Sequence, residues 1–323
     1  SALNVDEKVF SMFEEYAKKN NFIENFNELI SGERLNNTEN RAVTHFNYRD
    51  AKSDIYEASL NKMETLASEI KRRFKKILIF GIGGSYLGPK LMNDIFSSQD
   101  IEIDFITGSD SAEYQNYIEQ DLSDCAFIIT SKSFSTIETL TSYSAITKGK
   151  LLDQTFAVTS AVNKAEAFGI DSNNIAQIDL GTGGRFSIWS AVNLGLFISL
   201  GRDGFENLLS GAKSIDDLSS IDVNNPALSL AIQDLIMNNV LEMDSTLILN
   251  YDYKLRNYSS YAQQLEMESL GKSIDRDTGQ ALSNETGSIV WGGYGPRSQH
   301  SFFQHLFQGT KEANTYFIVS KTD

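Results

Sequence analysis

Cysteine, histidine and proline are all scarce in this sequence, and each shortage narrows what the chain can be. Its 323 residues include one cysteine, three histidines and three prolines. The lone Cys125 cannot form a disulfide within the chain and is expected to be a small core residue. No cluster of His, Cys and carboxylate residues has the spacing of metal ligands, so we predict no metal site.

Long apolar runs are also lacking. The most apolar segment, 188–200, is interrupted by Ser190, Asn193 and Gly195 and is shorter than the ~20 residues that a membrane span needs. It is therefore predicted to be a buried helix. The N-terminus is polar and acidic, without the apolar stretch of a signal peptide. We expect a soluble protein of the cytoplasm that contacts no membrane.

Positive charge is in short supply. The chain has 28 Lys and Arg against 43 Asp and Glu, a formal net charge of −15. This balance argues against nucleic acid or an anionic membrane surface as a partner, because neither would be attracted. A phosphate-bearing ligand would have to be held by local dipoles and a few well-placed cations.

The first half of the chain alternates short apolar runs with segments of helical length. After amphipathic helices predicted at 6–31 and 54–73, these runs occur at 75–80, 103–107, 126–130, 155–159 and 175–180. Strands that alternate with helices in this way indicate βαβ units and a parallel, doubly wound α/β sheet. Ligands of such sheets bind outside the carboxyl ends of the strands.

The second half repeats the alternation. A helical region at 203–240, with a helix start at Pro226, leads into predicted strands at 245–251, 288–292 and 315–319 and helices at 259–270 and 299–308. We therefore predict two α/β domains. The predicted boundaries are a helical N-terminal segment at 1–48, a first domain at 49–187 and a second at 188–323.

Four hydroxyl side chains follow the predicted strand 126–130 within six residues: Ser131, Ser133, Ser135 and Thr136. Ser135 and Glu138 have the spacing of a capping box, which predicts the N-terminus of a helix here. The unpaired N–H groups and the dipole of a helix N-terminus favour an anion, and hydroxyls add donors. This segment is predicted to be an anion site, with an ordinary capped turn as the alternative.

A glycine-rich loop follows the strand at 75–80 and runs from Gly81 to Pro89. It does not match a dinucleotide fingerprint, because Tyr86 occupies the position of the third glycine. It does not match a P-loop either, because no Gly-Lys-Ser/Thr closes it. A tight structural turn and a loop that approaches a ligand closely explain the spacing equally well.

Two further segments supply charged candidates. The loop 180–187 carries one cation, Arg185, which is a candidate. The basic cluster 71–73 is not a candidate, because it is expected to be simply solvated. In the predicted helix after residue 259, Gln264 and Glu268 are four residues apart and therefore on one face. A carboxylate beside an amide suits a base with a hydrogen-bonding neighbour, and a solvated polar face is the alternative.

Of the histidines, His300 is the candidate acid or base. It is predicted to lie at the start of a helix just beyond a strand, where a titratable side chain can face the ligand crevice. His45 and His305 are explained as well by satisfied structural histidines.

Five motifs occur in the order found in the phosphoglucose isomerase family, which the chain closely resembles from about Asn37 to Lys311. They are the glycine loop, the hydroxyl segment 131–139, and the segments 183–187, 267–272 and 299–311. Each motif is weak alone, but five in family order are specific. The resemblance implies two sugar-isomerase (SIS) domains, each an αβα sandwich, which agrees with the two α/β units predicted above.

The resemblance also implies a role for each candidate residue. The sugar phosphate is implied to bind Ser131, Lys132, Ser133, Thr136, Gly84 and Ser85. Arg185 is implied to stabilise an enediolate, and Glu268 to move the proton between C2 and C1 with Gln264 as a neighbouring substrate contact. His300 is implied to help open the sugar ring, and in the family this histidine comes from the partner subunit.

The implied activity is the reversible isomerisation of glucose 6-phosphate and fructose 6-phosphate, a step of glycolysis and gluconeogenesis. It implies a small sugar-phosphate substrate and a homodimer with a shared active site, with no metal and no cofactor. Two alternatives stay open: an isomerase of broader sugar specificity, and a catalytically weak sugar-phosphate-binding module.

Several positions depart from the family pattern. Ser133 replaces a usual Thr and keeps the hydroxyl, while Leu265, Leu270 and Gly293 replace residues that are commonly Gly, Asn and Glu. The family continues beyond the last motif into a segment with a catalytic lysine that works with the histidine in ring opening. The sequence ends at Asp323, so we expect this C-terminal part of the family fold to be absent from it.

Overall fold

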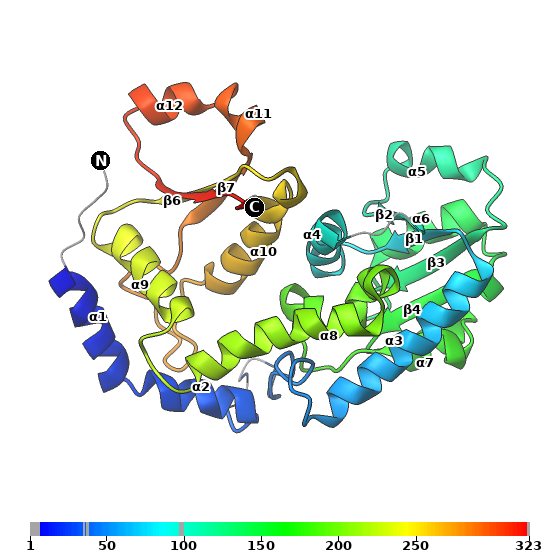
Figure 1. The fold of residues 1–323 in the computed structure, drawn as a ribbon, viewed down its shortest axis with the longest axis horizontal. Helices are drawn as coiled ribbons and strands as arrows, with labels where there is room; N and C mark the ends of the chain where they lie inside the picture. Colours follow the sequence, from blue (N-terminus) through cyan, green and yellow to red (C-terminus); the bar gives the residue numbers. More distant parts are fainter. Residues whose placement is uncertain (1–6, 35, 37–38, 97–99, 322–323) are drawn as a thin grey trace. The chain divides into compact units, whose positions relative to one another are not determined.

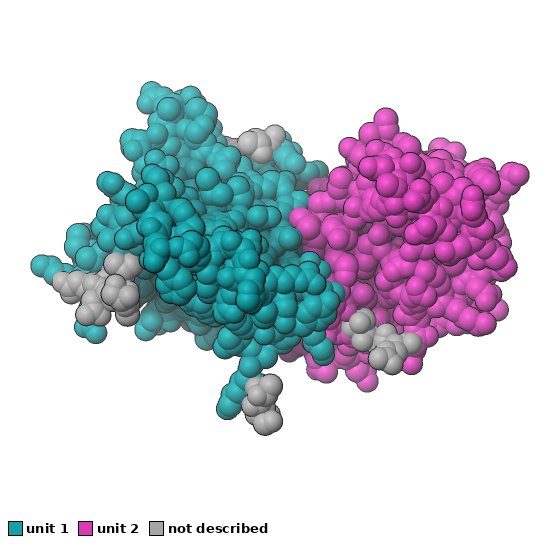
Figure 2. Space-filling view, turned by 90° about the horizontal axis from the view of Figure 1, so that it is seen from above, with its two compact units in different colours: residues 1–43, 211–323 teal, residues 44–210 magenta. Residues whose placement is uncertain are grey.

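A computed structural model describes residues 7–34, 36, 39–96 and 100–321. The start of the family resemblance, Asn37 and Thr38, lies outside these residues. Residues 44–210 form one compact unit, and residues 1–43 together with 211–323 form the other (Figure 2). The domain boundaries predicted above stay predictions, because compactness alone does not define a domain.

The unit 44–210 is built on a five-stranded parallel sheet in the order β2-β1-β3-β4-β5 (Figure 1). The strands are β1 (Lys76–Phe80), β2 (Glu102–Ile106), β3 (Cys125–Thr130), β4 (Thr155–Thr159) and β5 (Ile175–Gln177). Every residue of β3 is buried, as expected for the central strand of a sheet covered on both faces. The predicted parallel α/β sheet is confirmed, and so is the core position of Cys125.

Helices cover both faces of this sheet because successive strand residues point to opposite sides. The helices of this unit, besides α8, are α3 (Asp54–Arg73), α4 (Leu87–Phe96), α5 (Ser111–Ile118), α6 (Ile137–Thr147) and α7 (Val162–Phe168). On one face Ile79 and Ile128 join a core cluster with Leu60 of α3. On the other, Phe80 and Phe127 pack edge-on against the ring of Tyr143 in α6.

The predicted helix 188–200 begins later than expected. The 3₁₀ turns η4 (Gly184–Trp189) and η5 (Ala191–Asn193) come first, and α8 (Leu194–Ser219) follows with a kink at Gly201, where φ is 71°. Ser190 explains the delay, because its Oγ accepts from the Val192 N–H and donates to the Ser187 carbonyl oxygen, which favours turns over a continuous helix. Among the described residues, no helix combines the length and apolar character that a bilayer span requires.

The other unit contains a three-stranded parallel sheet in the order β7-β6-β8. Its strands are β6 (Ser245–Asn250), β7 (Ile289–Tyr294) and β8 (Asn314–Ile318), and its helices, besides the end of α8, are α1 (Glu7–Lys19), α2 (Phe22–Ser31), α9 (Pro226–Asn239), α10 (Tyr258–Leu270), α11 (Gly295–Gln299) and α12 (Phe303–Gln308). The predicted start of a helix at Pro226 is confirmed. The single helix predicted at 299–308 is wrong, because two short helices occupy this region.

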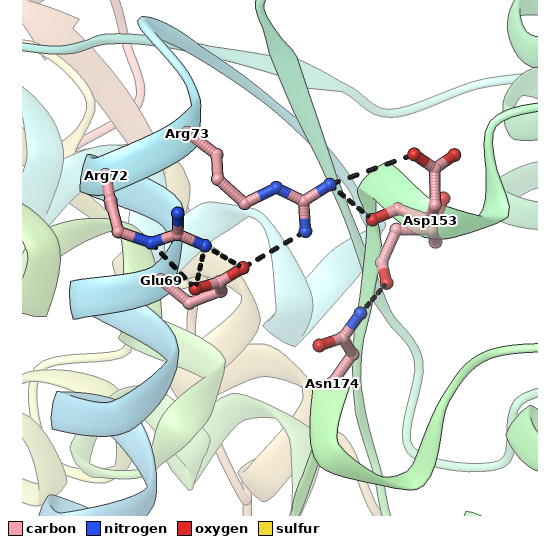
Figure 3. Close-up of polar contacts among 6 residues, drawn as sticks. Glu69, Arg72, Arg73, Asp153 and Asn174 are labelled. Atoms are coloured by element: carbon pink, nitrogen blue, oxygen red, sulfur yellow. Dashed lines mark hydrogen bonds and ion pairs between the residues drawn. The ribbon is translucent and has the colours of Figure 1, made fainter.

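The basic cluster at the end of α3 is not simply solvated, contrary to our expectation. The Glu69 carboxylate accepts from Arg72 at 2.8 Å and from Arg73 at 3.2 Å (Figure 3). Arg73 also donates to the main-chain oxygen of Asp153 at 3.0 Å. The spacing of three and four residues places these side chains on one face of the helix, which explains the pairing.

Candidate active site

Three loops from the unit 44–210 carry the predicted ligand groups. The glycine loop follows β1, the hydroxyl segment 131–136 follows β3, and the loop 178–187 follows β5. All three therefore start at the carboxyl edge of the parallel sheet, where ligands of such folds bind.

The glycine loop meets the loop after β5 by a close backbone approach. A Cβ at Gly84 would lie 2.2 Å from the carbonyl carbon and oxygen of Gly184 and 2.8 Å from the nitrogen of Arg185. A Cβ at Gly81 would lie 3.2 Å from the main-chain oxygen of Thr130, the last residue of β3. Glycine is thus required because backbones pack here, and this packing holds Ser85 beside the other two loops.

The hydroxyl segment folds back on itself. Phe134 is buried with φ at 46°, in the left-handed region, and its ring packs on Phe168 with centroids 5.6 Å apart. The reversal brings the hydroxyls of Ser131 and Thr136 to 2.9 Å from each other. Ser131 itself is buried. The hydroxyls at the two ends of the segment predicted for phosphate binding therefore converge.

The predicted capping box is wrong. The helix α6 begins at Ile137 with Thr136 as its N-cap, and no side chain of the described residues forms a capping hydrogen bond there. Ser135 instead donates its hydroxyl hydrogen to Ser133 Oγ at 2.8 Å. The turn at Phe134 moves the helix start one residue later than the spacing with Glu138 predicts. Without a capping side chain, the first N–H groups of α6 keep donor capacity for an anion.

Lys132 ties the hydroxyl segment to the loop after β5. Its Nζ donates to the main-chain oxygen of Thr182 at 2.7 Å, and its own carbonyl oxygen accepts from the Ser160 N–H and the Thr159 hydroxyl. The ammonium charge is therefore placed between two loops of the candidate site, where it also adds positive potential.

Arg185 lies in η4 with its guanidinium carbon 5.0 Å from the ring centroid of Phe186. Such cation–π contacts contribute ~0.5–2 kcal/mol and orient a planar guanidinium. The same Phe186 ring stacks on the imidazole of His45, with centroids 4.8 Å apart and planes at 17°. The sequence contained no local signal for this contact, because its partners lie far apart along the chain.

A structural histidine with satisfied hydrogen bonds is one explanation of His45 that the sequence allows, and the structure does not agree with it. Within the described part of the chain, its buried Nδ1 atom has no hydrogen-bond partner. Burial, and then the positive charge of Arg49, lower its pKa from the ordinary 6.5 to about 3. The ring is therefore neutral at physiological pH and cannot act as an acid there.

Glu268 and Gln264 lie in the other unit, on α10. They are one helical turn apart and share a face as predicted. Glu268 is exposed, whereas Gln264 is partly buried and its Oε1 has no hydrogen-bond partner among the described residues. Lys272 donates to the main-chain oxygens of Glu268 and Ser269, both at 2.7 Å, and so closes the C-terminus of this helix.

His300 does not begin a helix, contrary to our prediction. It is exposed and is the C-cap residue of α11, and its N–H donates to the Arg297 carbonyl oxygen. The cause is Gly295-Pro296, which starts a new helix directly after β7 and uses up the first turn before His300. The imidazole still lies just beyond the carboxyl end of a strand.

A cavity of about 780 Å³ lies at the amino ends of β4 and β5, away from these loops. Its charged lining includes Glu69, Arg72 and Arg73, which are paired with one another (Figure 3). The candidate site is therefore assigned to the loops at the carboxyl ends of the strands.

The chain was also compared with known proteins. The family model described as phosphoglucose isomerase matches residues 1–322. A glucose-6-phosphate isomerase from Wigglesworthia glossinidia brevipalpis is 35% identical over an alignment of 327 positions, which covers 90% of this chain and 59% of that protein. The crystal structure of a glucose-6-phosphate isomerase from Chlamydia trachomatis D/UW-3/Cx gives a TM-score of 0.84 at 27% identity, over 97% of this chain and 66% of that one.

A hypothetical protein from Thermus thermophilus shares the fold, with a TM-score of 0.61 at 22% identity over 84% of this chain and 68% of that one. The parallel sheets and the similarity to the Chlamydia structure define an α/β protein with the fold of that isomerase. Within that class, the chain belongs to the phosphoglucose isomerase family. It spans about three-fifths of the length of the curated relatives it matches, 59% for the Wigglesworthia protein.

The backbone approach at Gly84 predicts an asymmetric pair of variants. Gly84→Ala is expected to lower the free energy of unfolding by about 1–3 kcal/mol, the usual cost of overpacking, because its Cβ meets backbone that cannot move alone. Gly184→Ala is the matched control, since a Cβ there would meet no heavy atom of the described residues within 4 Å. Urea denaturation measures both. Equal stabilities would show that the two loops do not depend on this contact.

The partly buried His45 predicts an acid-sensitive contribution to stability. The unfolded chain takes up a proton on this ring below pH 6.5, whereas the folded protein does so only near pH 3. The free energy of unfolding should therefore fall as the pH drops through this window, by about 2 kcal/mol at pH 5, and be fully retained above pH ~7. His45→Phe should lack this loss when both proteins are unfolded in urea at pH 7 and pH 5. The prediction fails if wild type and variant lose the same amount.

Proposed function

We propose that the protein interconverts glucose 6-phosphate and fructose 6-phosphate by moving a proton between C2 and C1 through an enediolate, a step of glycolysis and gluconeogenesis. Membership of the phosphoglucose isomerase family supports this activity. The structural observation that carries it is the joining of the three loops, in which contacts of Gly84 and Lys132 bring the hydroxyl segment, the glycine loop and Arg185 to one edge of the sheet.

The phosphate is assigned to the N-terminus of α6 and the surrounding loops. Donors come from the hydroxyls and backbone of the two loops, and the helix dipole favours a dianion. The residues proposed for this binding are Ser131, Lys132, Ser133, Thr136, Gly84 and Ser85. Because the phosphate is remote from C1 and C2, its binding energy serves to position the reacting carbons.

Arg185 is assigned to the developing oxyanion. Proton abstraction next to a carbonyl leaves negative charge on oxygen, and a guanidinium held in place by Phe186 stabilises that charge without reorganising. Arg185 is already oriented by a ring, which fits a role that depends on geometry as well as charge.

Glu268 is assigned as the base, with Gln264 as a neighbouring substrate contact. The buried Oε1 of Gln264, which has no hydrogen-bond partner in the described part of the chain, keeps an acceptor available on the same helical face. The reaction transfers a proton within one molecule, so the proposal includes neither a metal nor a redox cofactor. Together with Arg185 and His300, a retained Glu268 supports isomerisation over sugar-phosphate binding alone.

His300 is assigned to opening of the sugar ring, and we propose that it acts in the site of a partner subunit within a cytoplasmic homodimer. Its exposure at the C-cap of α11 is compatible with donation to a second chain. A site shared in this way would make the dimer, and not the single chain, the active form.

The test of the proposed function is solvent exchange at C2. In deuterated water, wild type should place deuterium at C2 of glucose 6-phosphate, because the enediolate can collect a solvent deuteron. Glu268→Gln keeps the shape of the side chain but cannot accept a proton from carbon, so exchange should fall by about 10²–10⁴-fold with little change in KM. Proton NMR of the sugar measures the exchange.

Glu266→Gln is the matched control, because Glu266 lies on the same helix and points to a different face. It should exchange at a rate close to that of wild type. If a folded Glu268→Gln protein does the same, another residue is the base. If wild type exchanges nothing, the proposed activity itself is wrong.

The shared site predicts complementation between two inactive proteins. Glu268→Gln and His300→Ala should each be inactive alone. After mixing and subunit exchange, heterodimers should regain part of the activity, because one of their two sites then has both side chains. Coupled assay with fructose 6-phosphate measures the recovery, and mass spectrometry of the intact dimers verifies the exchange. Exchange without recovered activity would place His300 in the site of its own chain or outside catalysis.

A further inference from the structure

A stack of side chains runs from the segment after residue 43 to the candidate catalytic arginine. The His45 imidazole lies against Phe186 at 4.8 Å between centroids and against Phe46 at 4.1 Å. The guanidinium of Arg185 rests over the same Phe186 ring at 5.0 Å. The ring of Phe186 therefore contacts both a partly buried histidine and Arg185, the cation that the proposed function assigns to stabilising the oxyanion.

The segment that carries His45 is anchored to the loop after β5 both before and after this residue. Thr44 donates its hydroxyl hydrogen to Asp179 Oδ1 at 2.8 Å, and its N–H donates to the carbonyl oxygen of Gly181. Four residues beyond His45, the buried Arg49 guanidinium lies 4.8 Å from the ring of Trp189, which belongs to the same 3₁₀ turn as Arg185. The short segment 44–49 is thus attached to the loop after β5 before and after the histidine.

The chemistry of the ring limits what it can do. Burial and the neighbouring Arg49 hold its pKa at about 3, so the imidazole carries no charge at neutral pH and supplies no proton there. A neutral ring adds no second cation beside Phe186, which already contacts the Arg185 guanidinium. The contact with Phe186 depends on the planar shape of the imidazole.

We propose that His45 is a positioning residue for the isomerase reaction: its ring fixes the orientation of Phe186 and, through Phe186, the plane of the Arg185 guanidinium. This inference rests on the proposed function, in which Arg185 stabilises the oxyanion. A planar guanidinium stabilises an oxyanion only when its N–H groups point at it, so a loss of orientation lowers the rate and leaves phosphate binding intact.

The first experiment compares His45→Leu with His45→Phe. Leucine fills much of the space but has no flat face, and phenylalanine restores the stack. We expect kcat with fructose 6-phosphate to fall by about tenfold or more in His45→Leu, with KM within about twofold of wild type. His45→Phe should recover most of the rate, and His305→Ala, an exposed histidine of α12, should leave it unchanged.

A double-mutant cycle shows whether the effect passes through Arg185. If His45 acts by orienting the guanidinium, His45→Leu should lower the rate much less in an Arg185→Ala background than in wild type. Equal fold-losses in the two backgrounds would overturn the proposal. A loss in His45→Phe as large as in His45→Leu, or a change confined to KM, would overturn it as well.

A spectroscopic measurement separates this inference from the proposed function. The Nε–H signal of Arg185, assigned by its disappearance in Arg185→Lys, should carry the ring-current shift of Phe186. The shift should change in His45→Leu and be restored in His45→Phe, whether or not the protein isomerises sugars. An inactive wild type would refute the proposed function alone, while an unchanged Arg185 signal in His45→Leu would refute the positioning role alone.

Discussion

The candidate site depends on one steric constraint, the approach of two backbones at Gly84 and Gly184. A methyl group at Gly84 would lie 2.2 Å from the carbonyl atoms of Gly184, so the two loops can meet only if no side chain intervenes. The loop after β1 and the loop after β5 start from strands that are not neighbours in the sheet. Their contact, with the Lys132–Thr182 hydrogen bond, converts three separate loops into one arrangement of donors.

Electrostatic attraction of an anionic ligand has to be short-ranged in this protein. A chain with a net charge of −15 offers a phosphate no general attraction, so binding has to come from groups placed close to it. The uncapped start of α6 and the paired hydroxyls of Ser131 and Thr136 are the groups proposed to meet that need. The contact between the two hydroxyls fixes them in place, which lowers the cost of ordering them around a ligand.

The proposed chemistry is divided between two differently built parts of the chain. The unit 44–210 carries Arg185 and the groups proposed for phosphate binding on loops. The base candidate Glu268 is on the helix α10, whose end Lys272 closes. Loops that converge suit the enclosure of an anion, and a helix suits the fixed placement of a carboxylate next to Gln264. The proposed division therefore matches the enclosure of an anion to loops and the fixed placement of a base to a helix.

The sequence alone determined the strands, most helices and the family, because buried β-branched runs and helical spacing record which residues face the core. It also placed the hydroxyls after β3 and paired Gln264 with Glu268 on one face. Local spacing misled at Ser135, where the reversal at Phe134 displaced the helix start, and at His300, where Gly295-Pro296 began a helix early. Tertiary structure alone decided which distant segments meet: Gly84 with Gly184, Lys132 with Thr182, and His45 with Phe186. Such contacts are set by how whole layers pack, and no pattern within a few residues of either partner contains that information.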